Sequence, residues 1–413
     1  MNPLAWLYAR QGVMTLGLER IRALLRLLGD PQEAYPVALV GGTNGKGTAA
    51  RALAAVLGEA GLRVGLYTSP HLVAFPERIA VGGNPIPEEG LLALLEEVRP
   101  HAERVGASFF EAATALALLH FAREGVEFAV LEVGLGGRLD ATNAAEPRLS
   151  LVTNIGHDHL ELLGPTLRDV AREKAGILRR GVPALTAARG EGLEELRAQA
   201  GRLGAPLWVL GEAFALAGVE AGPSGLAFRL RLGGEERAFQ TPLLGPHQAE
   251  NLALAAVGGR LLGAPWEAVA RALLRVEHPG RLERLPWPGG KELLLDGAHN
   301  PEGAWALREA LRFHRLLPAA FVLAFSREKD HAAMAEALGD LGPVVLTRYA
   351  SPRSADPKAL LPLFPGASVE EEPLKALERA LALMDRVVVA GSLYLVGEVK
   401  RALLGLPPEE RWQ

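Results

Sequence analysis

The segment Ala38–Thr48 (ALVGGTNGKGT) constrains the fold of this chain more than any other. The apolar run Val37–Val40 predicts a buried strand, which leads into a glycine-rich turn and then a helix from about Thr48 to Ala60. In such a turn backbone N–H groups can converge on phosphate oxygens, while the helix N-terminus and Lys46 add positive charge. Thr48 is placed to offer its hydroxyl to Mg²⁺. The alternative is a tight glycine turn without a ligand. Gly47 separates Lys46 from Thr48, so the segment is not a strict Walker A motif.

The rest of the chain continues this alternation of short apolar runs and longer amphipathic segments, which predicts an α/β fold. A mostly parallel P-loop-type sheet with helices on both faces is expected first, and a smaller C-terminal Rossmann-like α/β domain after it. Residues 213–244 break the rhythm with partly alternating runs and Gly-rich turns, which predict a small antiparallel part. Further strands are expected at 62–67, 127–133, 149–154 and 182–185, and helices near 88–103, 108–123, 166–178, 248–262 and 266–274.

Proline and glycine concentrate in residues 276–290 (VEHPGRLERLPWPGG), which we interpret as an interdomain linker. Residues 1–275 then form a nucleotide-type domain, and residues 291–413 form the second domain. Apolar runs at 292–296, 319–326, 343–347 and 386–392 predict its strands.

Composition narrows the functional classes. The chain has no cysteine, which excludes disulfides, thiolate metal sites and cysteine nucleophiles. A net charge of -4 argues against nucleic acid as the main partner. No apolar run approaches the roughly 18 residues of a membrane span, and no signal peptide is visible, so we expect a cytoplasmic protein without a membrane partner. Only 7 of the 44 basic residues are lysines, so a lysine within a motif indicates a specific chemical need.

Ten sequence blocks together resemble the folylpolyglutamate synthase and dihydrofolate synthase family of the Mur ligase superfamily. The first is GTNGKGT within the glycine-rich turn. The others follow in the order of that family and cover nearly the whole chain: YTSPHL (67–72), FFEAATALAL (109–118), LEVGLGGRLDATN (131–143), TNIGHDHLELLG (153–164), REKAGILRRGVP (172–183), GPHQAENLALA (245–255), HPGRLE (278–283), LLDGAHNPEGA (294–304) and GSLYLVGEV (391–399).

The resemblance implies an ATP site and two Mg²⁺ ions. Glu132 closes an apolar strand, where an acid is a natural Mg²⁺ partner or else a solvated strand end. In the resembling enzymes such a Glu bridges the two ions; a monovalent cation such as K⁺ is a further candidate. The implied metal ligands are Thr48, Ser69, Glu132 and His159. The implied ATP contacts are Gly42, Thr43, Asn44, Gly45, Lys46, Gly47, Thr48, Asn251, Arg281, Asp296 and His299.

The resemblance also implies catalytic and substrate-binding residues. Lys46, Lys174 and His299 are expected to be catalytic, with Lys174 carbamylated; from composition alone Lys174 is a surface ion-pair residue. Segment 15–20 (TLGLER) otherwise looks like the start of an amphipathic helix. The implied folate or pteroate contacts are Thr15, Leu16, Gly17, Leu18, Phe110 and Arg138, and Ser392 belongs to the wall that binds glutamate.

The implied activity is ATP-dependent ligation of L-glutamate to tetrahydrofolate and also to dihydropteroate, through an acyl phosphate, by a monomer acting on small molecules. One alternative is a polyglutamate synthase without the dihydropteroate activity. Another is a muramyl-peptide ligase, although the roughly 40 residues before the glycine-rich turn are too few for a UDP-binding domain. A nucleotide-dependent switch protein is the third, but it would not need the strand-end Asp296 and His299 of a second domain.

Overall fold

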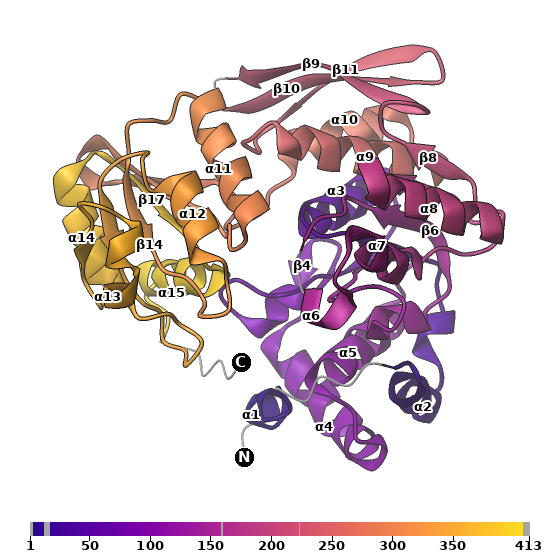
Figure 1. Ribbon diagram of the computed structural model, residues 1–413. Helices are drawn as coiled ribbons and strands as arrows, with labels where there is room; N and C mark the ends of the chain where they lie inside the picture. The colour runs from indigo at the N-terminus through magenta and orange to yellow at the C-terminus, as the bar shows by residue number, and fades with distance from the viewer. Residues whose placement is uncertain (1–2, 12–16, 158–159, 223, 408–413) are drawn as a thin grey trace.

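A computed structural model describes residues 3–11, 17–157, 160–222 and 224–407, which form two α/β domains side by side (Figure 1). The larger domain contains about the first two thirds of the chain, in indigo through magenta to salmon. The smaller domain contains the C-terminal part, in orange and yellow. Each domain is built around one sheet that is covered by helices on both faces.

The sheet of the larger domain has eight strands in the order β4-β3-β2-β5-β1-β6-β7-β8. β1 lies between β5 and β6 and is parallel to both, whereas β3 and β4 are antiparallel at one edge. The carboxyl ends of the parallel strands therefore meet at one edge, where the glycine-rich turn begins. The strands are β1 (Val37–Gly41), β2 (Val64–Tyr67), β3 (Ile79–Val81), β4 (Asn84–Pro85), β5 (Phe128–Glu132), β6 (Pro147–Val152), β7 (Ala184–Thr186) and β8 (Leu207–Val209).

Helices bury apolar faces on both sides of this sheet. One core cluster includes side chains of α2 (Glu19–Leu27), α4 (Glu88–Val105), α5 (Phe109–Arg123) and α8 (Gly190–Leu203). The other includes side chains of α3 (Lys46–Glu59), α9 (His247–Leu261) and α10 (Trp266–Arg275). The remaining helices of this domain are α1 (Pro3–Tyr8), α6 (Leu160–Leu163) and α7 (Leu167–Ala175), with short 3-10 turns at Pro31–Glu33, Phe75–Arg78 and Ala141–Ala144.

A separate three-stranded antiparallel sheet packs against α9 and α10. Its strands are β9 (Phe214–Gly222), β10 (Gly225–Leu232) and β11 (Glu235–Thr241). Phe228 and Phe239 bury their rings in the core that these two helices share with the large sheet. The antiparallel part expected at 213–244 is thus present.

The smaller domain has a six-stranded sheet in the order β12-β13-β17-β14-β15-β16, in which only the β12–β13 pair is antiparallel. Helices α11 and α12 cover one face, and α14 and α15 cover the other. The strands are β12 (Glu283–Trp287), β13 (Lys291–Leu295), β14 (Ala320–Leu323), β15 (Val344–Leu346), β16 (Ser368–Val369) and β17 (Arg386–Ala390). The helices are α11 (Pro301–Phe313), α12 (His331–Leu338), α13 (Pro357–Leu360), α14 (Pro373–Leu383) and α15 (Leu393–Leu403), with 3-10 turns at Pro288–Gly290 and Leu361–Leu363.

The structure confirms the expected fold class but changes one detail of the linker. Residues Glu283–Trp287, within the proposed linker at 276–290, form the edge strand β12. Pro286 is compatible with this position because an edge strand does not need every N–H for pairing. Within the described part of the chain, no helix is long and apolar enough to span a bilayer.

Candidate active site

The glycine-rich turn connects β1 to α3 and has the backbone shape that only glycine tolerates there. Gly42 has φ +133°, and a β-carbon at this position would lie 1.9 Å from Thr153 Oγ1. Gly45 has φ +84°, and a β-carbon there would lie 2.2 Å from Asn251 Oδ1. The turn is therefore squeezed between the residue that follows β6 and helix α9.

Hydrogen bonds fasten the first half of this turn to the loop after β6. The N–H groups of Thr43 and Asn44 donate to the backbone and side-chain oxygens of Asn154 at 2.9 and 2.8 Å. Gly156 N donates to Thr43 Oγ1 at 2.9 Å. Helix α3 begins at Lys46, and the N–H groups in the first turn of a helix are suited to bind an anion.

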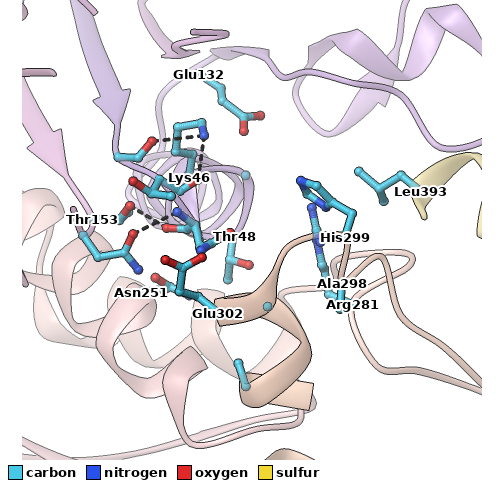
Figure 2. A pocket seen from close by; sticks show the side chains of 18 of the residues that line it. Lys46, Thr48, Glu132, Thr153, Asn251, Arg281, Ala298, His299, Glu302 and Leu393 are labelled. Atoms are coloured by element: carbon cyan, nitrogen blue, oxygen red, sulfur yellow. Dashed lines mark hydrogen bonds between the residues drawn. The ribbon is translucent and has the colours of Figure 1, made fainter. Parts of the chain in front are cut away.

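Two lysines converge on one carbonyl oxygen of the turn. Lys46 Nζ donates to Gly42 O at 3.1 Å and to Thr43 O at 3.0 Å (Figure 2). Lys174 Nζ, from α7, donates to the same Gly42 O at 2.8 Å. Lys174 is only 4% exposed. It therefore contacts the phosphate loop from a buried position in α7, contrary to the surface ion pair that composition alone suggests.

Side chains with oxygen atoms that could coordinate a metal ion lie near the carboxyl ends of β2 and β5. Glu132 is the last residue of β5, and its Oε2 accepts a hydrogen bond from Ser69 N at 3.0 Å. Burial raises the pKa of the Glu132 carboxyl, while the charge of Lys46 and the bond from Ser69 lower it. Glu132, Ser69 and Thr48 line the same cavity.

This donor set fits Mg²⁺. The ion prefers hard oxygens and is bound by one or two carboxylates with waters and substrate phosphates. A buried carboxylate beside two hydroxyls meets that requirement. No cluster of three or more His, Asp or Glu side chains that could hold a metal occurs among the described residues, and His159 lies outside them. The ligand role of His159 stays a prediction.

His278 is a site residue that sequence reasoning assigned no role. Its Nδ1 lies 2.8 Å from Thr48 Oγ1, and a β-carbon on Gly47 would lie 3.0 Å from its Cε1. Burial, followed by the charges of Arg51 and Arg281, lowers the pKa of His278 well below its ordinary value, so the imidazole is neutral. The block HPGRLE contained the only sequence signal for it.

The smaller domain contributes the opposite wall. Asp296 directly follows β13, and its oxygens accept from Leu282 N at 2.8 Å and Ala298 N at 2.9 Å. Burial raises the pKa of Asp296, and nearby Arg281 opposes this. His299 Nδ1 lies 2.8 Å from Gly297 O; because that oxygen can only accept, Nδ1 carries the proton.

A cavity of about 410 Å³ lies between the domains and brings most of the expected residues together. Figure 2 shows Lys46, Thr48 and Glu132 on one side and Arg281 and His299 on the other. Ser392 also lines it and caps α15 by accepting from Tyr394 N at 3.2 Å. The expected residues that line it are Gly42, Thr43, Asn44, Gly45, Lys46, Gly47, Thr48, Ser69, Glu132, Lys174, Asn251, Arg281, Asp296, His299 and Ser392.

None of the described folate contacts that were expected is among the residues lining this cavity, although Phe110 touches its wall. The ring of Phe110 lies against Gly134, a residue of the cavity wall, where a β-carbon would approach Phe110 Cζ to 2.5 Å. Arg138 is half-exposed and donates through Nε and Nη2 to Glu173 Oε1 at 3.0 and 2.8 Å. Gly17 and Leu18 are half-buried, whereas Thr15 and Leu16 lie outside the described residues.

Family models match both domains. Residues 40–258 match the Mur ligase middle domain, and residues 280–393 match the Mur ligase glutamate ligase domain. The fold and site thus define a two-domain Mur ligase. A curated relative, the dihydrofolate synthase/folylpolyglutamate synthase of Bacillus subtilis, is 34% identical over 97% of this chain and 98% of its own length. The chain therefore belongs to the folylpolyglutamate synthase/dihydrofolate synthase family of Mur ligases.

Solved structures agree with this assignment. Mycobacterium tuberculosis folylpolyglutamate synthase in complex with ADP and AMPPCP matches with a TM-score of 0.89 and 32% identity, over 98% of this chain and 100% of that one. Escherichia coli FolC in complex with DHPP and ADP matches with a TM-score of 0.89 and 29% identity, over 98% of both chains.

Proposed function

We propose that this protein is an ATP-dependent ligase that joins L-glutamate to the carboxylate of tetrahydrofolate and of dihydropteroate, releasing ADP and phosphate. The observation that carries the proposal is the interdomain cavity. It unites a phosphate loop and Glu132 from one domain with Asp296 and His299 from the other. The names of the relatives and the ligands of the solved structures support the same reaction.

The phosphate loop is suited to hold ATP for attack by a carboxylate. The start of α3 and Lys46 line the cavity where the phosphates would bind, and Asn251 and Arg281 also line it. Thr48, Ser69 and Glu132 would hold Mg²⁺, with His159 as a further proposed ligand. When bound, Mg²⁺ supplies positive charge that neutralises the phosphates.

The chemistry then proceeds in two displacements. The acceptor carboxylate attacks the γ-phosphorus of ATP, the bond to ADP breaks, and an acyl phosphate forms. The amine of L-glutamate attacks the acyl carbon, an amide forms, and phosphate leaves. With Nδ1 bonded to Gly297 O, Nε2 is the other ring nitrogen, and we assign this atom the proton that the attacking amine loses.

The two acceptors differ in length, so their pterins must occupy different positions. Phe110, beside the cavity wall, can stack on a pterin, and the segment containing Gly17 and Leu18 is the proposed site for the pterin of dihydropteroate. A monofunctional polyglutamate synthase is the second candidate. The monomeric state and the cytoplasmic location stay predictions.

Glutamate-dependent ADP release by the purified protein tests the proposal. We expect release with dihydropteroate and with tetrahydrofolate, and loss of both after chelation of Mg²⁺. Release with tetrahydrofolate alone would leave the monofunctional enzyme. Release with neither folate, but with a muramyl peptide, would overturn the proposal.

A further inference from the structure

The N-terminus of α11 reaches across the cavity and contacts the phosphate loop of the other domain. Asn300 is the N-cap residue of α11: its Oδ1 accepts from Gly303 N at 2.8 Å. The Nδ2 of the same carboxamide donates to Asn44 Oδ1 at 3.2 Å. One side chain therefore caps the start of a helix in the smaller domain and contacts the phosphate loop of the larger one.

A second residue of α11 makes a parallel contact. Glu302 Oε1 accepts from His157 N, in the loop after β6, at 3.1 Å. Its Oε2 is buried and has no hydrogen-bond partner among the described residues. Glu302 also lies close to Gly156, where a β-carbon would approach Oε1 to 3.2 Å. Figure 2 shows Glu302 below the phosphate loop, on the side facing Thr48 and Asn251.

The two loops that α11 contacts behave as one unit. Asn154 accepts from the N–H groups of Thr43 and Asn44, and Thr43 Oγ1 accepts from Gly156 N. A nucleotide in the phosphate loop therefore lies against the same unit that Asn300 and Glu302 contact from the smaller domain. His299 directly precedes Asn300, so the same contacts determine where His299 lies over the loop.

We infer that Asn300 and Glu302 form a clasp that couples nucleotide binding to domain closure and places His299 over the reacting atoms. Both are positioning residues: they act through the phosphate loop and through His299. The inference deepens the proposed function and rests on it for the role of His299. A closed clasp also keeps water from the acyl phosphate; water would otherwise attack it, giving back the carboxylate and releasing phosphate.

The chemistry of the carboxamide explains why Asn suits this position. An acceptor oxygen is needed for the helix cap, and a donor is needed for Asn44 Oδ1. Aspartate caps a helix as well as asparagine does, but it presents only acceptors. Asn300→Asp therefore keeps the cap of α11 while removing the amide donor that reaches Asn44 Oδ1.

The first test measures closure without relying on activity. The chain lacks cysteine, so spin labels can be placed at Glu96→Cys and Glu378→Cys, one exposed position in each domain. Pulsed electron resonance then gives the distance between the labels with and without ADP and Mg²⁺. We expect ADP to shorten this distance in the parent and in Glu309→Gln, an exposed site on the same helix.

In Asn300→Asp and in Glu302→Ala we expect the open population in the presence of ADP to rise about fivefold, because an interdomain hydrogen bond is lost. Closure of both variants to the same extent as the parent would overturn the inference. Thermal unfolding of each variant shows that the helix cap is preserved. Because the measurement uses only ADP and Mg²⁺, its result does not depend on whether the protein has the proposed ligase activity.

The second test measures leakage of the acyl phosphate. The ratio of ADP released to glutamate incorporated should stay near one in the parent and in Glu309→Gln. It should rise in Asn300→Asp, because an open site admits water, while the KM for ATP changes less than kcat. An unchanged ratio in Asn300→Asp would contradict a positioning role.

Discussion

At the scale of single residues, Lys46 offers the most direct test of the phosphate loop. Its ammonium contacts the carbonyls of Gly42 and Thr43. We expect Lys46→Ala to remain folded but to lose at least about a hundredfold in turnover, because a charge-assisted contact to the phosphates is removed. Glutamate-dependent ADP release measures this, with the exposed Lys358→Ala as the control. Turnover within threefold of the parent would remove the loop from the active site.

Lys174 is expected to carry a carbamate. Its ammonium and that of Lys46 share one acceptor, Gly42 O, and two like charges this close disfavour each other in a buried site. Reaction of the Lys174 amine with CO₂ replaces its positive charge with a negative one and turns the repulsion into an attraction. Intact mass under bicarbonate and high-resolution density test this, and Lys174→Ala should be strongly impaired. A bare ammonium in a metal-loaded, bicarbonate-equilibrated crystal would count against it.

Two of the expected site residues follow one geometric rule. Glu132 ends β5 and Asp296 directly follows β13, and in each domain the parallel strands bring their carboxyl ends to one edge of the sheet. His278 and Glu302 follow no such rule. They reach the site because the domains meet there, and neither a strand end nor a glycine turn marks them in the sequence.

At the scale of elements, the start of α2 connects the proposed pterin segment to α5. Arg20 Nε donates to Glu111 Oε2 at 3.1 Å, and Glu111 is part of the capping box of α5 with Ser108. Phe110 immediately precedes Glu111. We expect Arg20→Ala to reduce kcat/KM for dihydropteroate more than for tetrahydrofolate, because this segment is proposed to hold only the pterin of dihydropteroate.

Steady-state assays with each acceptor measure the effect, and Arg22→Ala, an exposed arginine of the same helix, serves as the control. Equal losses with both acceptors would show that the segment supports the fold of α5 and does not discriminate between substrates.

Elements with long apolar runs or clear periodicity were predictable, and so were the three-residue strands β7 and β15, but several other very short strands were not. The strands β1, β5 and β6 consist mainly of buried apolar residues. The segments that form α4 and α5 are long enough to be recognised as helices. By contrast, β3, β4, β8 and β16 are two or three residues long. They form strands because an adjacent strand of the sheet is available for pairing, which the local sequence does not indicate. β12 was hidden because proline and glycine beside it suggested a linker.

At the scale of the whole molecule, lowering the pH should reduce the free energy of unfolding through His247, a buried histidine that lines the interdomain cavity. Burial, with smaller contributions from Arg281 and His314, lowers the pKa of His247 to about 4. An unfolded histidine titrates near 6.5, so the unfolded chain binds more protons between these values. The free energy of unfolding therefore falls as the pH is lowered from about 6.5 to about 4, by about 3 kcal/mol in total for this group.

Urea unfolding across this range, in the parent and in His247→Gln, measures the effect as a difference between the two. We expect a shallower decline in His247→Gln. Parallel declines would show that His247 does not titrate in this window in the folded protein. His314, whose pKa burial also lowers, contributes to both proteins and cancels in the comparison.

The order of the domains was visible in the sequence, whereas the contacts between them were not. Asn44 and Asn300 are 256 positions apart, and nothing local to either segment indicates that they meet. Such contacts depend on how the two folded domains pack against each other. Hydrophobic periodicity and turn residues describe each element by itself and carry no information about that packing.

The double anchorage of Gly42 O by Lys46 and Lys174, together with the Asn154 contacts, has a consequence for the entropy of nucleotide binding. Ordering a flexible loop would cost on the order of 1–2 kcal/mol for each residue fixed. Here the loop is ordered when the chain folds, so an arriving nucleotide does not bear that cost. Association should then be limited by encounter and not by rearrangement of the loop.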